Sequence, residues 1–287
     1  MLVWRIARHL LSIVATILLG GLLAATMARL APGADVDERQ LDPHLNAQSL
    51  QALHASREQE RNIFAFYWHY LGNAAHGDLG ISHSLDRPVA ELLRDRVPVT
   101  MRLVVLGLGI AWAFAAALAF STVILPGRAW DLFSTSLSGL FLCIPAAALA
   151  LLAVILNVPV SLAIAVVVFP KIFRYVRNLL AKTYNMEHIT TARAQGIGET
   201  RILLWHAIPV AAPQILALAG ISVSLALGAS IPVEALCGIP GIGQLAWQAA
   251  LGRDLPLLVN LTLLVTLVTL LANSGADVIA HISRSQS

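Results

Sequence analysis

The chain reads EHITTARAQGIGETRILLWHAIP at residues 187–209, a polar stretch inside an otherwise strongly apolar sequence. Gly196 and Gly198 predict that this stretch breaks into two short helical pieces, because glycine is favoured where a helix must end or bend. The stretch also has residues too apolar for a solvated turn: Ile197, Ile202, Leu203 and Trp205. A short amphipathic helix would bury them in a partner's groove or in the lipid interface. An ordinary basic loop held by anionic lipid is an open alternative on these residues alone.

Composition places the rest of the chain in a membrane. Of the 287 residues, 57% are hydrophobic and 12% are charged, whereas soluble domains carry about 25% charged residues. The net charge of +3 is uneven, since residues 33–98 hold ten acids and six arginines and the remainder of the chain carries +7. The surplus lies beside apolar runs, which favours retention on the cytoplasmic side of a membrane over binding to nucleic acid.

Hydropathy predicts six membrane-spanning helices and an all-α fold, because a span needs about 20 mostly apolar residues. The predicted spans are Leu10–Ala28, Leu103–Leu125, two short spans within Leu132–Pro170, Ala207–Val233 and Leu255–Ala276. Within the 39-residue run Leu132–Pro170, the break is expected at Asn157-Val158-Pro159, since proline resists the helix interior and turns favour asparagine. We expect the first span to be retained, because its apolar run is longer than that of a typical signal peptide.

Charge then orients these spans. Between residues 171 and 206 six basic residues oppose Glu187 and Glu199, which predicts a cytoplasmic location for this loop. Six spans therefore place both termini in the cytoplasm and residues 33–98 outside. The outer segment includes a predicted helix over Arg57–Leu71.

Several motifs, in order along the chain, resemble one family. Thr191-Ala192-Arg193-Ala194-Gln195-Gly196 is similar to the cytoplasmic "EAA" loop of ABC importer permeases of the dipeptide/oligopeptide/nickel group, although the triplet's glutamate is absent. Further similarity lies in the opening Met1–Pro32, in HGDLGIS at 76–82, in Glu234 followed by GIPGIG at 238–243, and in Asn273 with Asp277. The family usually has a longer outer stretch where this chain has Asn157-Val158-Pro159.

The resemblance implies the type I importer (MetI-like) fold and a permease subunit working by alternating access in the bacterial inner membrane. It implies a first transmembrane helix at 1–30, an extracytoplasmic segment at 31–99, and a five-helix core at 100–287 with a coupling loop at 182–208. The expected cargo is a small solute, foremost a di- or oligopeptide. Expected partners are two ABC ATPase subunits that hold ATP and Mg, a second permease forming a heterodimer, an extracytoplasmic solute-binding protein and the lipid bilayer.

The resemblance also implies residue roles. The expected ATPase-coupling residues are Glu187, Thr191, Ala192, Arg193, Gly196, Ile202 and Trp205. Ala192 and Gly196 would allow close approach and the bend, Arg193 and Glu187 would make polar contacts, and Ile202 and Trp205 would pack the coupling helices against the spans. The expected extracytoplasmic turn holds Glu234, Pro240, Gly241 and Gly243. The Glu234 carboxylate is expected to satisfy backbone groups of that turn. No catalytic residue, metal ligand or cofactor site is expected on this chain, and ATP hydrolysis is assigned to a separate subunit.

Two other classes compete with this interpretation. An ATP-independent channel or secondary transporter predicts intramembrane charges and an internal sequence repeat, and we find neither in the sequence. A membrane scaffold without a transport role is the third class. Dependence of ATPase binding on Gly196 would separate them.

Overall fold

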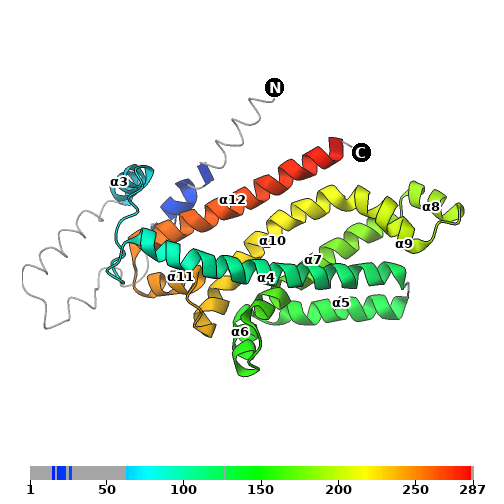
Figure 1. Ribbon diagram of the computed structural model, residues 1–287, viewed down its shortest axis with the longest axis horizontal. Coiled ribbons are helices and arrows are strands. Elements are labelled where there is room, and N and C mark those ends of the chain that lie inside the picture. Colours follow the sequence, from blue (N-terminus) through cyan, green and yellow to red (C-terminus); the bar gives the residue numbers. More distant parts are fainter. Residues whose placement is uncertain (1–14, 17, 24–25, 28–62, 126, 286–287) are drawn as a thin grey trace, which may run out of the picture. The chain divides into compact units, whose positions relative to one another are not determined.

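A computed structural model describes residues 15–16, 18–23, 26–27, 63–125 and 127–285 (Figure 1). Every regular element in these residues is a helix, apart from a single antiparallel bridge between Ile81 and Pro88. The first predicted span and the predicted outer segment lie only in part within the described residues: those described within 15–27 are helical, and the outer segment is described from residue 63 onward. The helices are α3 (Ile63–Ala75), α4 (Val89–Ile124), α5 (Arg128–Cys143), α6 (Ala146–Ile155), α7 (Val160–Tyr184), α8 (Glu187–Ala194), α9 (Glu199–Ile202), the π-helical turn η2 (Leu203–Ala207), α10 (Ile208–Cys237), α11 (Ile242–Leu251) and α12 (Leu255–Ser285).

Three described helical stretches are long and apolar enough to cross a membrane: Val89–Ile124, Glu199–Cys237 and Leu255–Ala280. They contain the fifth and sixth predicted spans and all of the second except its last residue, Leu125. The bent pair α5 and α6 adds a fourth if it crosses as one span. Helix α7 occupies the place of the fourth predicted span. It is not among the apolar stretches above, because Lys171, Arg174 and Arg177 put three charges within it. A six-span protein is consistent with these helices.

The long apolar run 132–170 contains one more break than the sequence predicted. The expected break is present, since α6 ends at Ile155, Asn157 has φ of 52° and α7 begins at Val160. A second break lies at Ile144 and Pro145, where α5 and α6 meet at 92°. Pro145 carries no backbone N–H and disfavours helical backbone at Ile144. The first half of this run is therefore bent at Pro145, a break that the sequence analysis did not predict.

The described residues divide into two compact units, one within residues 1–97 and 245–268 and the other within residues 98–244 and 269–287. In the second unit α7 is the core helix, packed against α5, α6 and α10. Its Phe169 ring lies edge-on to Phe114 of α4, with ring centroids 4.9 Å apart, and to Phe141 of α5 at 5.6 Å. Gly107 of α4 permits a close approach to α7, because a Cβ there would lie 2.9 Å from the Ile164 side chain.

The first unit is held together by buried polar contacts around an aromatic pair. Tyr67 and Tyr70 of α3 pack on Val259 of α12, and the Tyr70 hydroxyl donates to the Asn260 side-chain oxygen at 2.6 Å. The Asn260 amide in turn donates to the Leu79 carbonyl at 2.9 Å. These bonds fix the segment after α3, which contains the HGDLGIS motif, against the start of α12.

Candidate functional site: a clamped elbow between α7 and α10

Residues Glu187–Ala207 form an elbow, the name used below for α8, the turn after it, α9 and η2. Figure 1 shows α8 and α9 at the end of the bundle where α7 leads in and α10 leads out. Residues 195–198 separate α8 from α9. The prediction of two helical pieces broken near the two glycines is confirmed.

Gly196 is the residue at which the chain turns. Its φ of +79° lies in the left-handed region, which glycine adopts without a steric penalty. The Gly196 N–H donates to the Arg193 carbonyl at 3.0 Å, and the Ile197 N–H donates to the Ala192 carbonyl at 3.2 Å. This pair of bonds is the Schellman helix ending, which satisfies the last carbonyls of α8. Gly198 has a different position, because it is the residue before the first turn of α9. Its φ of −65° is one that any residue can adopt.

An ion pair closes the elbow across this turn. The Arg193 guanidinium donates to the two carboxylate oxygens of Glu199, from Nε at 2.7 Å and from a terminal nitrogen at 3.2 Å. Glu199 raises the pKa of Arg193 through the hydrogen bond and through charge. Two-point contacts of this kind specify geometry, because the planar guanidinium matches the planar carboxylate. The pair therefore fixes α8 against α9.

Tyr184, the last residue of α7, connects this clamp to the helix before it. Its hydroxyl lies 3.5 Å from the Glu199 carbonyl oxygen. Burial, and next the negative charge of Glu199, raise the pKa of Tyr184 to about 12, with Arg193 opposing them. Tyr184 is therefore a neutral donor at any physiological pH. Neither Tyr184 nor Glu199 was among the expected coupling residues, because contacts that span 6 and 15 residues across a turn follow no helical periodicity.

The elbow has an inward and an outward face. Buried residues of the inward face are Ile189, Ala192, Ile202, Leu203 and Ala207. The outward face includes Glu187, Thr191 and Gly196, and it carries Leu204 and Trp205, which are 52% and 73% exposed. Ile202, which we expect to pack the coupling helices against the spans, is buried on the inward face.

Two residue expectations for the elbow were wrong. Trp205 does not pack against the spans, because its side chain projects from η2 on the outward face. Ala192 is 4% exposed, so its small side chain permits packing inside this chain and does not face outward. Which side chains of the elbow point inward depends on how its very short helices are rotated about their axes. Tertiary contacts set that rotation, so the sequence pattern alone did not predict it.

The π-helical turn η2 joins the elbow to α10. The Ile208 N–H donates to the Leu203 carbonyl, five residues back. Pro209 follows and has no N–H, so Trp205 loses the donor that an α-helix would give its carbonyl. Short π-helical turns of this kind occur frequently at functional sites.

The second predicted site is the turn between α10 and α11. Glu234 is fully buried, and its Oε2 accepts a hydrogen bond from the Gly243 N–H at 2.6 Å. The expectation that this carboxylate satisfies backbone groups of the turn is confirmed. Gly241 and Gly243 are buried and Pro240 is exposed. A Cβ on Gly243 would lie 2.6 Å from the Ile231 Cα, so this glycine is required by the close approach of the chain.

Sequence reasoning missed two residues that hold such turns. The Thr100 Oγ1 accepts a hydrogen bond from the Ile242 N–H at 2.7 Å, across 142 residues of sequence. The buried carboxylate of Asp254 accepts from the Ser82 hydroxyl at 2.5 Å, from Ser84 through both its N–H and its hydroxyl, and from the Leu257 N–H. The Ser82 contact gives a physical reason for the serine of the HGDLGIS motif.

The described residues bring together no group of three or more His, Cys, Asp or Glu side chains that could hold a metal ion. The geometry suits transmission of movement. Leu204 and Trp205 form an exposed apolar patch on the elbow, and the elbow is joined to the long helices α7 and α10.

Comparison with known proteins agrees with this architecture. The family model described as "Binding-protein-dependent transport system inner membrane component" matches residues 107–285. The chain is 26% identical over 292 residues to the glutathione transport system permease protein GsiC of Escherichia coli O6:H1 (strain CFT073), covering 96% of this chain and 95% of the relative. The GsiC proteins of Escherichia coli K12 and Shigella boydii serotype 4 are 25% identical with the same coverage.

The fold also has a solved counterpart. A chain from the inward-facing MetNI methionine ABC transporter superposes with a TM-score of 0.60 at 20% identity, covering 67% of this chain and 96% of that one. The protein therefore belongs to the family of binding-protein-dependent transport system inner membrane components: it is the non-enzymatic, multi-pass permease subunit of an inner-membrane ABC importer, which also comprises a separate ATPase and a solute-binding protein.

Proposed function

We propose that this permease translocates a peptide-like solute and that the elbow is the surface through which the ATPase drives it. The solute class is supported by relatives named for glutathione transport, similar over 96% of this chain. Glutathione is a tripeptide, so the shared chemistry is a small peptide with free carboxylates.

One observation carries the coupling role. Leu204 and Trp205 project from an elbow whose two halves are clamped by Arg193 and Glu199. An exposed tryptophan and leucine next to a rigid turn suit a hydrophobic groove on a partner, where aromatic residues contribute most of the binding free energy. The clamp supports transmission of a push as a rigid body. Glu187 and Thr191 lie on the same outward face and would contact the rim of that groove.

Charge supports the sidedness of this proposal. Cations cluster on and beside α7 where it approaches the elbow: Lys171, Arg174, Arg177 and Lys182. Such clusters are retained in the cytoplasm, so the elbow and the coupling loop 182–208 are cytoplasmic, and both termini share that side. Residues 1–30 then form the first transmembrane helix, 31–99 the extracytoplasmic segment and 100–287 the five-helix core. The Glu234–Gly243 turn lies at the outer mouth.

The assembly follows from this arrangement. Two ATPase subunits hold ATP and Mg, and one of them binds this elbow. A second, different permease supplies the other half of the pathway, and a solute-binding protein docks outside. Closure of the ATPases on ATP moves the elbow, α7 and α10 together, which switches the pathway from inward to outward facing.

The test is uptake by a reconstituted importer containing the cognate ATPases, sister permease and binding protein. We expect uptake of labelled glutathione or dialanine that requires ATP. We also expect Trp205→Ala to weaken ATPase binding about tenfold or more, as for a buried tryptophan anchor. Trp247→Ala is the matched control, because Trp247 of α11 is also exposed, at 53%, but lies outside the elbow.

Each outcome tests a separate part of the proposed function. Uptake that proceeds without ATP would favour the channel or secondary transporter instead. ATP-driven uptake restricted to solutes that are not peptides would overturn the solute class and leave the coupling role intact. Equal effects of the two tryptophan substitutions on ATPase binding would rule out the elbow as its docking surface.

A further inference from the structure

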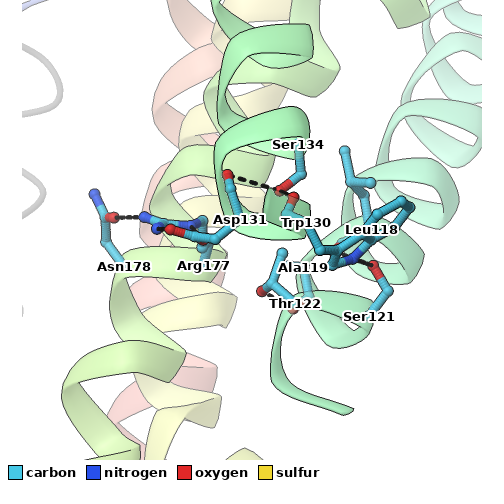
Figure 2. A network of polar contacts seen from close by, with 9 residues as sticks. All are labelled: Leu118, Ala119, Ser121, Thr122, Trp130, Asp131, Ser134, Arg177 and Asn178. Atoms are coloured by element: carbon cyan, nitrogen blue, oxygen red, sulfur yellow. Dashed lines mark hydrogen bonds and ion pairs between the residues drawn. The ribbon is translucent and has the colours of Figure 1, made fainter. Parts of the chain in front are cut away.

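A second ion pair, between Asp131 and Arg177, joins α5 to α7 (Figure 2). The Arg177 guanidinium donates three hydrogen bonds to the Asp131 carboxylate. Nε donates to Oδ1 at 2.8 Å, and one terminal nitrogen donates to Oδ1 and to Oδ2, each at 2.5 Å. The Arg177 side chain is 25% exposed and that of Asp131 is 45% exposed. The sequence motifs of the family resemblance involve neither residue.

The surroundings of Asp131 hold it in place from a second side. The neighbouring Trp130 donates its indole N–H to the Ser121 hydroxyl of α4 at 3.0 Å and stacks on Phe133, with ring centroids 5.4 Å apart. The Ser134 hydroxyl donates to the Trp130 carbonyl at 2.9 Å. Figure 2 shows Trp130, Asp131 and Ser134 at the beginning of α5, with Ser121 beside Trp130 and Arg177 beside Asp131. The beginning of α5 is thus tied to the end of α4 and to α7 at once.

Stability alone is a poor explanation for this pair. Partly buried ion pairs gain little net free energy, since desolvation of the two charges offsets much of their attraction. Their geometry is nevertheless specific, because the planar fork of arginine fits a carboxylate in few orientations. The Asp131–Arg177 contact therefore adds little to stability but fixes the relative position of α5 and α7.

Arg177 is well placed to relay movement of the elbow. It lies seven residues before Tyr184 on the continuous helix α7, about 10 Å at 1.5 Å per residue. Helix α5, on the other side of the pair, leads through the 92° bend into α6. A displacement of the elbow therefore reaches Arg177 along α7, and the ion pair can pass it to α5 in addition to the packing of the two helices.

We propose that the Asp131–Arg177 pair is a joint that stays closed through the transport cycle and carries elbow movement from α7 to α5. Asp131 and Arg177 are positioning residues, and neither contacts solute or ATP in this role. The inference rests on the proposed coupling function of the elbow, because without a drive at the elbow the joint has nothing to transmit.

The first experiment measures solute taken up per ATP hydrolysed by the reconstituted importer. Asp131→Asn and Arg177→Gln each remove one charge, and we expect uptake per ATP to fall about fivefold or more, the usual size of a lost coupling. ATP hydrolysis stimulated by the binding protein stays near the wild-type rate. The reversed pair, Asp131→Arg with Arg177→Asp, restores the ratio. Arg174→Gln is the matched control on α7, because it removes an exposed cation outside the joint, and it leaves the ratio unchanged.

The second experiment separates a permanent joint from a latch that opens. Asp131→Cys and Arg177→Cys are combined with Cys143→Ala and Cys237→Ala, and a short thiol crosslinker joins the two new cysteines. A permanent joint predicts that crosslinked importer still takes up solute with ATP. Loss of uptake on crosslinking overturns the proposal, since the pair would then have to separate in each cycle.

Two further results overturn it. One is an unchanged ratio of uptake to ATP in both single variants. The other is an equal fall in uptake and ATP hydrolysis with normal amounts of the complex in the membrane, which would mean structural support alone. ATP-independent uptake by the wild-type importer would instead remove the proposed function itself, so the two failures are distinguishable.

Discussion

Gly196 is the residue whose replacement tests the elbow most sharply. Its φ of +79° costs an L-residue such as alanine about 1–2 kcal/mol, although a Cβ there would meet nothing within 4 Å. We therefore expect Gly196→Ala to distort the turn between α8 and α9 and to lower ATP-driven uptake. Uptake and binding of the ATPase are measured together in membrane vesicles.

Gly198→Ala is the control for this substitution. Gly198 also has open space at the Cβ position, but its φ of −65° suits any residue. We expect near wild-type uptake for Gly198→Ala and an intermediate value for Gly196→Asn, because asparagine tolerates the left-handed region better than alanine does. Equal loss of uptake in the two alanine variants would contradict a role for the backbone conformation of Gly196.

Single residues were predictable from sequence where their role is local. Gly196 could be placed at a bend, and Glu234 at the turn that follows it within nine residues, because both depend on nearby chain. Thr100 and Asp254 could not, since their partners lie 142 and up to 172 residues away. The outward position of Trp205 was missed for a related reason: the rotation of a five-residue turn is set by what packs around it.

At the scale of helices, sequence signals worked where turn chemistry was explicit. Asn157-Val158-Pro159 marked a true break, because asparagine accepts the left-handed φ of 52° and Pro159 precedes a new helix. The break at Pro145 was missed, since the residues around it are as apolar as a span and hydropathy alone cannot register a 92° bend.

Close contact between α10 and α12 gives a prediction at this scale. A Cβ on Gly220 would lie 2.8 Å from the Ala276 Cβ and 3.0 Å from both the Ala272 carbonyl oxygen and the Asn273 Cα. Because two of these atoms are backbone, Gly220→Ala must push the helices apart. We expect a loss of about 1–3 kcal/mol in the free energy of unfolding, typical of overpacking, seen as a lower melting temperature by tryptophan fluorescence in detergent.

Gly228→Ala, eight residues further along α10, is the matched control. Its Cβ would meet nothing within 4 Å, and alanine favours a helix over glycine by about 1 kcal/mol. The control should therefore melt at or above the wild-type temperature. A Gly220→Ala protein as stable as the Gly228→Ala protein would show that the contact between α10 and α12 is not tight.

For the molecule as a whole, composition was the strongest guide. The 12% of charged residues predicted a membrane protein, and several motifs in order along the chain indicated the family to which it belongs. The identity of the solute could not be predicted from the sequence, because it depends on which helix faces line the pathway between two permeases. The Asp131–Arg177 joint was also beyond reach, since the 46 residues between its partners carry no periodic signal.

Membrane sidedness is the prediction that the whole molecule must satisfy. In a chain carrying Cys143→Ala and Cys237→Ala, Thr191→Cys places one thiol on the exposed face of α8, and Ile81→Cys places one at a residue that is 60% exposed in the outer segment. The cations between residues 171 and 206 favour a cytoplasmic elbow. A membrane-impermeant maleimide should therefore label Thr191→Cys in inverted vesicles and Ile81→Cys in intact spheroplasts. Assembly with the ATPase should protect Thr191→Cys and leave Ile81→Cys reactive, whereas the reverse pattern of labelling would place the elbow outside the cell and out of reach of any ATPase.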